Sequence, residues 1–227
     1  MGNIKQVVIP AAGLGSRLDC GMPKCMLEIN GKKIIDYIFD CLEDVPHVRM
    51  VVGFKADEII NYVIKRRPDV TFVRNPDFEN TSCNYSLWLG SRDISGAFCT
   101  FDSDTIIPSG RFAEFDRCCH EGESVLAVIP VRTEYPIYAH IENGNTLSEL
   151  SLERKSDYEW GGLVWMNGGV NPRHQYVYQN LNDIAPLPAI LSEYYEIDTA
   201  RDYLKTVESA VAGAFSSFTT VGRHGSA

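Results

Sequence analysis

Strand-like and helix-like segments alternate along the first half of this 227-residue chain, and this alternation constrains the fold more than any other feature. Short apolar runs predict strands, whereas an apolar side chain at every third or fourth position predicts an amphipathic helix. Strands separated by helices are typical of a parallel sheet with helices on both faces. The expected strands span residues 4–11, 48–54, 70–74, 97–101 and 125–131, and the expected helices span residues 33–43, 56–67, 85–92 and 111–120.

The pattern changes beyond residue 131, where strand signals follow one another more closely. The runs 137–142 and 146–150 flank Asn143-Gly144-Asn145, and Asn-Gly between two such runs is a strong hairpin signal. A further strand is expected at 162–166 and a closing helix at 199–212. The sequence therefore predicts an α/β fold, a Rossmann-like αβα sandwich with a mostly parallel central sheet and a late β-rich insertion.

One domain, residues 1–215, accounts for this pattern, because the chain contains no internal repeat. The last residues, 216–227, are small and polar, and we expect them to form a flexible tail.

The composition excludes several classes of protein. A net charge of −9 argues against binding to nucleic acid, since such proteins usually carry a basic surface. No segment approaches the ~20 apolar residues that cross a bilayer, and the N-terminus has no signal-peptide pattern, so we expect a cytoplasmic protein without a membrane partner. The seven cysteines include no C-x-x-C pair, which favours structural thiols over a zinc site.

A glycine loop, residues 11–18, follows the first expected strand directly and is followed by Pro23-Lys24. Glycines let the backbone approach phosphates closely, and successive N–H groups can form an anion-binding nest. The loop is not a Rossmann fingerprint, because the third glycine is missing, nor a Walker A loop, because no Gly-Lys-Ser/Thr follows. The candidate nucleotide-binding residues here are Ala11, Ala12, Gly13 and Gly15.

This arrangement, G-x-G-x-R-x5-P-K after the first strand, resembles the N-terminal signature of the nucleoside-triphosphate transferases that activate sugar phosphates, phosphocholine and inositol phosphate. The resemblance implies the nucleotide-diphospho-sugar transferase type of fold. It also implies that Arg17 and Lys24 are catalytic residues, which hold the triphosphate and offset the charge that develops during attack on the α-phosphorus. The alternative is that both are solvated loop charges.

A pair of carboxylates, Asp102 and Asp104, ends the expected strand 97–101. Ligand sites in open α/β sheets lie at the carboxyl ends of strands, and Mg²⁺ takes one or two carboxylates together with substrate phosphate oxygens. In the resembled family the corresponding strand ends in an acidic motif whose Asp binds the metal, and Asp104 is the better match. Asp102 is then expected on the nucleotide side. Alternatively, both residues simply form a turn.

A third carboxylate, Asp198, lies in Glu196-Ile197-Asp198-Thr199 and resembles the Asp that completes the metal site of phosphocholine and inositol-phosphate cytidylyltransferases. Glu196 lies two residues earlier and would face the same side of an extended strand as Asp198, so it is a second, weaker metal candidate. Thr199 and Asp202 also form a capping-box pattern, so Asp198 can instead favour the helix dipole.

The resemblance extends to two further segments. Lys155 matches a family lysine that contacts the acceptor phosphate, although it can equally be a solvated charge. Asn84 and Ser86 lie in a segment that resembles the base-reading segment of cytidylyltransferases, which favours CTP. Alternatively, Ser82 or Asn84 caps a helix.

Aromatic residues are frequent in the second half of the chain: Tyr135, Tyr138, Tyr158, Trp160 and Trp165. A quaternary ammonium group such as choline favours an aromatic cage. These residues, however, alternate with apolar ones in expected strands, which favours core packing.

Together these observations predict a Mg²⁺-dependent nucleotidylyltransferase. It would transfer an NMP unit, most favourably CMP from CTP, to a small phosphorylated acceptor such as phosphocholine, a polyol phosphate or a sugar 1-phosphate, and release pyrophosphate. Two alternatives remain at this point: a glycosyltransferase that uses a nucleotide sugar, and a non-catalytic nucleotide-binding regulator of the same fold.

Overall fold

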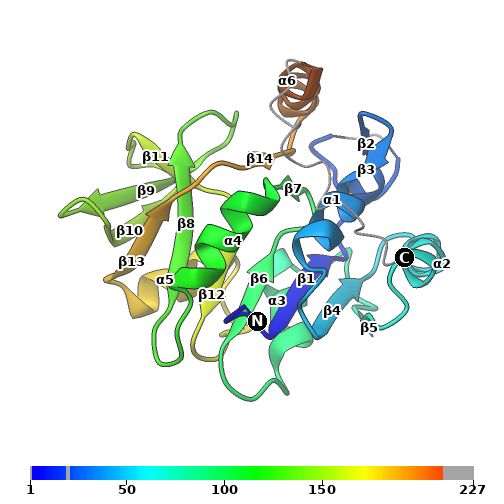
Figure 1. Cartoon of the computed structure of the whole chain (residues 1–227), viewed down its shortest axis with the longest axis horizontal. Coiled ribbons are helices and arrows are strands. Elements are labelled where there is room, and N and C mark those ends of the chain that lie inside the picture. Colours follow the sequence, from blue (N-terminus) through cyan, green and yellow to red (C-terminus); the bar gives the residue numbers. More distant parts are fainter. Residues whose placement is uncertain (1, 19–20, 212–227) are drawn as a thin grey trace, which may run out of the picture.

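The computed structural model describes residues 2–18 and 21–211, and a large mixed sheet forms its centre (Figure 1). The strand order across this sheet is β11-β9-β10-β13-β8-β12-β6-β1-β4-β5. Its strands are β1 (Gln6–Ala11), β4 (His47–Val52), β5 (Thr71–Arg74), β6 (Phe98–Phe101), β8 (Val125–Pro130), β9 (Ile137–Glu142), β10 (Thr146–Ser151), β11 (Tyr158–Trp160), β12 (Leu163–Met166) and β13 (Leu187–Leu191).

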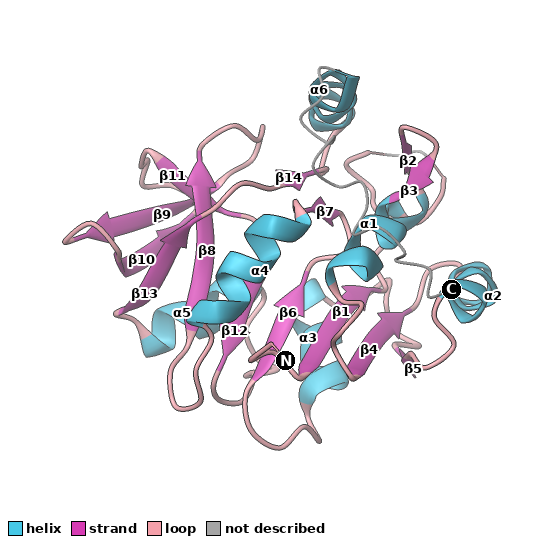
Figure 2. Cartoon of the chain, in the orientation of Figure 1, coloured by secondary structure: helices cyan, strands magenta, loops and turns pink. Residues whose placement is uncertain are grey.

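The α-helices of the described residues cover the two faces and one end of this sheet (Figure 2). They are α1 (Ile34–Cys41), α2 (Ala56–Arg66), α3 (Cys83–Ser91), α4 (Ser109–Cys118), α5 (Val177–Ile184) and α6 (Ala200–Val211). The expected αβα sandwich is confirmed.

The half of the sheet built from the first hundred residues is parallel, because helices carry the chain back between its strands. β1 pairs in parallel with β4 and β6, and β4 pairs in parallel with β5. β12 runs antiparallel between β6 and β8. Beyond β8, the expected hairpin β9–β10 and the short β11 form an antiparallel extension, which is the predicted β-rich insertion.

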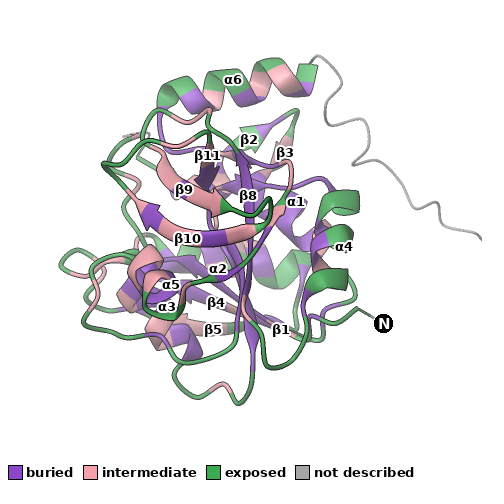
Figure 3. Ribbon diagram, turned by 90° about the vertical axis from the view of Figure 1, so that its left-hand side faces the viewer, coloured by how far each residue is buried: buried purple, intermediate pink, exposed green. Residues whose placement is uncertain are grey.

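The alternation of side chains along β1 separates two hydrophobic cores. Val7, Ile9 and Ala11 point to the core that α1, α2 and α4 cover, whereas Val8 points to the core that α3 and α5 cover. Figure 1 shows α1 and α4 on the near side of the sheet and α3 and α5 on the far side. The strands are largely buried, whereas α6 has a broad exposed face (Figure 3).

Two small ladders lie at the carboxyl end of the parallel strands. β7 (Thr105–Ile106) pairs antiparallel with β14 (Tyr195–Glu196), and β2 (Glu28–Ile29) pairs with β3 (Lys32–Lys33). α6 follows β14 and crosses this end of the molecule (Figure 3). Late and early parts of the chain thus meet at the edge where ligand sites of α/β sheets lie.

The predicted capping box at α6 is confirmed. The backbone N–H of Thr199 donates to Asp202 Oδ2 at 3.0 Å, and the N–H of Asp202 donates to Thr199 Oγ1 at 3.2 Å. Ser82 likewise caps α3, where its Oγ accepts from the N–H of Tyr85 at 3.2 Å. Both side chains satisfy N–H groups that have no partner inside the helix.

The sequence did not predict β11, β13 and α5, nor the two-residue strands β2, β3, β7 and β14. β11 has three residues, too few to show the alternation of a strand. β13 contains Pro188, a residue that weakens a strand signal. The predicted tail, 216–227, lies outside the described residues.

The aromatic residues of the insertion divide by burial. Trp160 and Trp165 are 3% and 4% exposed, which confirms core packing for these two. The cysteines of residues 2–18 and 21–211 are all free thiols, and three of them, Cys25, Cys99 and Cys119, are buried. None of the helices in these ranges is long and apolar enough to cross a membrane.

Candidate active site

The glycine loop begins where β1 ends at Ala11, next to β4. The carbonyl of Ala12 accepts from the N–H of Phe54 at 3.0 Å, which ties the start of the loop to the neighbouring strand. Gly15 has φ +66°, a backbone conformation that residues other than glycine rarely adopt. A Cβ at this position would lie 3.3 Å from Lys24 Cγ. The loop glycine therefore leaves room for the lysine side chain.

Lys24 begins a short 3₁₀ helix, Lys24–Met26, directly after Pro23. The N–H of Met26 donates to the carbonyl of Pro23 at 2.9 Å, and Cys25 is 1% exposed in the core. Since the neighbouring residue is anchored inside the protein, the backbone of Lys24 is fixed and its side chain extends past the glycine loop.

The acidic motif forms a turn between β6 and β7. The N–H of Thr105 donates to the carbonyl of Asp102 at 3.2 Å, which closes the turn. The N–H of Ile197 then donates to the carbonyl of Asp104 at 3.0 Å, next to the β7–β14 ladder. This ladder brings Asp198 beside Asp104.

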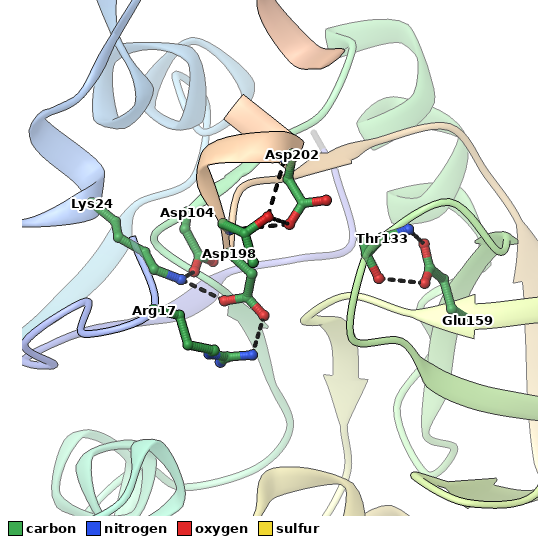
Figure 4. A network of polar contacts seen from close by, with 8 residues as sticks. Arg17, Lys24, Asp104, Thr133, Glu159, Asp198 and Asp202 are labelled. Atoms are coloured by element: carbon green, nitrogen blue, oxygen red, sulfur yellow. Dashed lines mark hydrogen bonds and ion pairs between the residues drawn. The ribbon is translucent and has the colours of Figure 1, made fainter. Parts of the chain in front are cut away.

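Four predicted site residues converge here, as Figure 4 shows. Lys24 Nζ donates to Asp104 Oδ2 at 2.7 Å and to Asp198 Oδ1 at 2.5 Å. Arg17 Nη1 donates to the other oxygen of Asp198, Oδ2, at 2.5 Å. The side chains of Lys24, Asp104 and Asp198 are only 13%, 17% and 9% exposed, whereas Arg17 is 55% exposed. The sequence predicted each residue, and the structure unites them.

The electrostatics of this cluster are dominated by its carboxylates. Burial by itself would lower the pKa of Lys24, but Asp104 and Asp198 outweigh it and hold that pKa above its usual value. Burial and the charges of Asp104 and Asp198 raise the pKa of Asp102. Burial, Asp198 and Asp104 likewise raise the pKa of Glu196. Asp102 and Glu196 thus favour their neutral forms more than exposed carboxyl groups do.

Two adjacent glycines, Gly161 and Gly162, leave space for the carboxyl groups of Glu196 and Asp102, and no sequence motif indicated them. A Cβ on Gly162, which has φ +87°, would lie 2.1 Å from Asp102 Oδ2, and a Cβ on Gly161 would lie 2.6 Å from Glu196 Oε2. The N–H of Asp102 also donates to the carbonyl of Gly162 at 3.2 Å. The adjacent glycines were visible in the sequence, but nothing there indicated which side chains they face.

The cluster fits a hard divalent cation. Lys24 Nζ is a stand-in cation that Asp104 and Asp198 already bind at 2.7 and 2.5 Å, so two carboxylate oxygens converge on one point. Carboxylate oxygens are ligands that Mg²⁺ prefers, with substrate phosphates and water supplying the rest. No group of three or more His, Cys, Asp or Glu within residues 2–18 and 21–211 is arranged to hold a metal by itself. The donor set therefore fits a metal that arrives with a nucleotide.

Asn84 and Ser86 are more buried than base-reading residues need to be. Asn84 is fully buried, its amide N–H groups donate to the carbonyls of Asn171 and His174, both at 2.9 Å, and its oxygen accepts from Asn180 Nδ2 at 2.7 Å. Ser86 is 4% exposed and accepts from an amide at 3.1 Å. Both side chains tie α3 to its neighbours, and their role toward a base stays a prediction.

Lys155 lies in the connection between β10 and β11 and is exposed. Its ammonium group has no hydrogen bond or ion pair with a described residue, and the structure does not bring it to the cluster of Lys24, Asp104 and Asp198. Its neighbour Arg154 pairs with Glu149 at 2.9 Å. The predicted contact of Lys155 with an acceptor phosphate stays a prediction.

A second polar group, which no motif indicated, lies beside the cluster (Figure 4). Glu159 is 1% exposed and accepts from the N–H groups of Arg132 and Thr133 at 3.0 and 3.1 Å, and from Thr133 Oγ1 at 2.6 Å. These hydrogen bonds fix the loop after β8 to strand β11 of the insertion. The sequence carried no signal for it, because these residues are far apart and match no motif.

Comparison with known proteins agrees with this geometry. The family model of the MobA-like NTP transferase domain matches residues 7–154, so the chain belongs to this family. The chain is 30% identical over 116 residues to the CTP:phosphoglutamine cytidylyltransferase of Campylobacter jejuni, covering 49% of this chain and 45% of that protein. It is 36% identical over 69 residues to the 2-C-methyl-D-erythritol 4-phosphate cytidylyltransferase of Vibrio atlanticus, covering 30% and 28%.

These alignments span less than half the length of either relative. Among solved structures, the CTP:phosphocholine cytidylyltransferase of Streptococcus pneumoniae superposes with a TM-score of 0.74 at 18% identity, covering 90% of this chain and 98% of that one. At this identity the superposition establishes a shared fold. The fold expected from the resemblance is thus confirmed.

Proposed function

We propose that this protein is a Mg²⁺-dependent nucleotidylyltransferase, which transfers an NMP unit from an NTP to a small phosphorylated acceptor and releases pyrophosphate. The observation that carries the proposal is the convergence of Arg17, Lys24, Asp104 and Asp198 beside the glycine loop. Two cationic side chains suit a triphosphate, and two convergent carboxylates suit the metal that accompanies it. Membership of the NTP transferase family supports the same reaction.

The proposed chemistry is an in-line displacement. An oxygen of the acceptor phosphate forms a bond to the α-phosphorus while the bond from that phosphorus to the leaving pyrophosphate breaks. A phosphate oxygen is already an anion, so the step needs no general base and no covalent enzyme intermediate. The work of the protein is to hold two anions together and to offset their charge.

Each residue of the cluster has a separate task in this scheme. The loop at Gly13 and Gly15 approaches the triphosphate with backbone N–H groups. Asp104 and Asp198 would hold Mg²⁺, which neutralises phosphate oxygens. Lys24 and Arg17, the two cationic side chains of the cluster, would offset the charge that grows on the leaving pyrophosphate.

CTP is the donor that we favour. The motif around Asp198 and the segment of Asn84 and Ser86 resemble cytidylyltransferases, and both curated relatives carry cytidylyltransferase names. A site that hydrogen-bonds the exocyclic amine of cytosine leaves a buried group without a partner when UTP binds, which costs ~1–3 kcal/mol, or roughly tenfold or more in specificity.

A pyrophosphate-release assay with Mg²⁺, the four ribonucleotides and dTTP, against a panel of phosphorylated acceptors, tests the proposal. We expect release only with an acceptor present, and the highest kcat/KM with CTP. A different best donor would refute the base preference and leave nucleotidylyl transfer standing. Release of UDP or GDP from a nucleotide sugar would instead favour a glycosyltransferase, and nucleotide binding without turnover would favour a regulator.

A further inference from the structure

A cavity of about 310 Å³ opens directly beside the carboxylate cluster. It lies between the loop after β8, the strand β14 and the first turns of α6. Glu196 lines it, and Asp198 and Asp104 lie close enough to Glu196 to raise the pKa of its carboxyl group, so the cavity adjoins the proposed metal site. This volume suits a small organic molecule. Its lining residues are Arg132, Thr133, Tyr195, Glu196, Asp202 and Lys205, with residues 206, 208 and 209.

Arg132 is the main cationic group of this cavity, and its hydrogen-bonding capacity is not used up. Its Nη2 is buried without a hydrogen-bond partner in the described structure. Its backbone is fixed at both ends, because the N–H donates to Glu159 at 3.0 Å and the carbonyl accepts from Lys205 Nζ at 2.8 Å. A buried guanidinium N–H without a partner is unfavourable, so an anion that lets Arg132 turn this group toward it restores the missing hydrogen bond.

The ring of Tyr195, the aromatic residue that lines the cavity, already contacts a cation, the guanidinium group of Arg132. The guanidinium carbon of Arg132 lies 4.1 Å from the centre of the Tyr195 ring. Trp160 and Trp165 are buried, and each donates its indole N–H to a carbonyl, so neither is available as a cage wall. The cavity therefore does not present the open aromatic faces that a quaternary ammonium group requires.

Three acidic residues, Glu196, Asp202 and Glu208, also line the cavity beside its two cations, Arg132 and Lys205. Asp202 Oδ2 accepts from the N–H of Thr199 at 3.0 Å and from Thr199 Oγ1 at 2.8 Å, so its carboxylate is used to cap α6. Glu208 is exposed. Arg132 and Lys205 thus lie together at the cavity, with Lys205 held over the carbonyl of Arg132.

We propose that this cavity binds the acceptor, and that Arg132 recognises a carboxylate on the acceptor, distal to the phosphate that attacks. This inference rests on the proposed function, because it places the acceptor phosphate at the adjoining cluster of Lys24 and Asp198. The planar fork of a guanidinium matches a carboxylate with two parallel hydrogen bonds. The proposal separates this protein from enzymes whose acceptor ends in a quaternary ammonium group.

Two matched pairs of compounds test the carboxylate directly. O-phosphoserine differs from O-phosphoethanolamine by a carboxylate, and 3-phosphoglycerate carries a carboxylate where glycerol 3-phosphate has a hydroxymethyl group. Calorimetric affinity is measured for all four, with Mg²⁺ and a non-hydrolysable CTP analogue present, and kcat/KM is measured with CTP. We expect the carboxylated member of a pair to be favoured about tenfold or more.

Variants of Arg132 show whether this residue causes the preference. Arg132→Gln should reduce the preference to about one, and Arg132→Lys, which keeps the charge without the fork, should retain a part of it. The control is Arg154→Gln, which removes an exposed guanidinium paired with Glu149 outside the cavity and should keep the full preference.

The outcomes separate this inference from the proposed function. Tighter binding of the carboxylated members that is lost in Arg132→Gln supports the inference even if no pyrophosphate is released, in which case the proposed function fails alone. Equal affinity for the two members of both pairs overturns the inference. Failure of all four compounds to bind at millimolar concentrations overturns it too. A preference that survives Arg132→Gln overturns it as well.

Discussion

Replacing Lys24 by Met should make the stability of this protein depend on divalent cations. In the wild type, the Lys24 ammonium binds Asp104 at 2.7 Å and Asp198 at 2.5 Å, and all three side chains are less than a fifth exposed. Without the ammonium, two carboxylates face each other in a poorly solvated site. Mg²⁺ would bind them without having to displace a lysine, so it should stabilise the variant more than the wild type.

The expected magnitude follows from the burial of the pair. Removing one partner of a buried ion pair costs about 3–5 kcal/mol, and the lower end applies because Arg17 still pairs with Asp198. For a chain of this size, about 3 kcal/mol corresponds to a fall in Tm of roughly 6–12 °C. Turnover should fall as well, with kcat lowered far more than nucleotide affinity, since Lys24 acts on charge that develops in the transition state.

Thermal denaturation with and without Mg²⁺ measures the first effect. Lys55→Met is the matched control, because Lys55 is 37% exposed and pairs with Glu58, which is 60% exposed, so its loss should cost about 1 kcal/mol or less. If Lys24→Met melts like the wild type and Mg²⁺ raises both Tm values equally, the stand-in role of Lys24 is wrong. If only KM for the nucleotide rises, Lys24 is a binding residue alone.

Two further predictions concern the carboxylates. Asp104→Asn and Asp198→Asn should each nearly abolish turnover with Mg²⁺ supplied while circular dichroism stays native; an active variant would remove that residue from the metal site. Gly162→Ala should cost at least ~1 kcal/mol more in the free energy of unfolding than Gly122→Ala, because both glycines have φ near +90° but only the new Cβ at 162 meets Asp102. Equal losses in the two variants, measured by urea denaturation, would show that Asp102 moves away freely.

Local patterns predicted much of the fold and the catalytic parts of the site. The alternation along β1 and β4 and the Asn-Gly turn of the β9–β10 hairpin depend on residues close in sequence, and these predictions are confirmed. The glycine loop and Asp104 were recognisable because each directly follows a strand. Thr199 was recognised as part of a capping box, and Ser82 was one of two possible caps of α3, because a cap acts within one helical turn.

Local patterns do not show which distant segments meet; only the resemblance to a known family indicated that Asp104 and Asp198 belong to one site. Lys24 and Asp198 are 174 residues apart, and their contact depends on the β7–β14 ladder, whose strands are too short to show a period. Asn84 fitted both a cap and a base contact; in the structure it is a buried link to the segment before α5, and its role toward a base stays a prediction. Arg132 and Glu159 follow no motif, because a buried carboxylate that accepts from a loop backbone leaves no local pattern.

The fate of the α-phosphorus shows whether the protein transfers a nucleotidyl unit to a phosphorylated acceptor. CTP labelled at the α-phosphorus is incubated with Mg²⁺, the protein and an acceptor that supports pyrophosphate release, and the products are separated. We expect the label to move to a CMP-linked acceptor in equal amount to the pyrophosphate released, with none left on the protein and no product formed by Asp198→Asn. Label retained on the protein, or released only as free CMP, would contradict direct transfer to a phosphorylated acceptor.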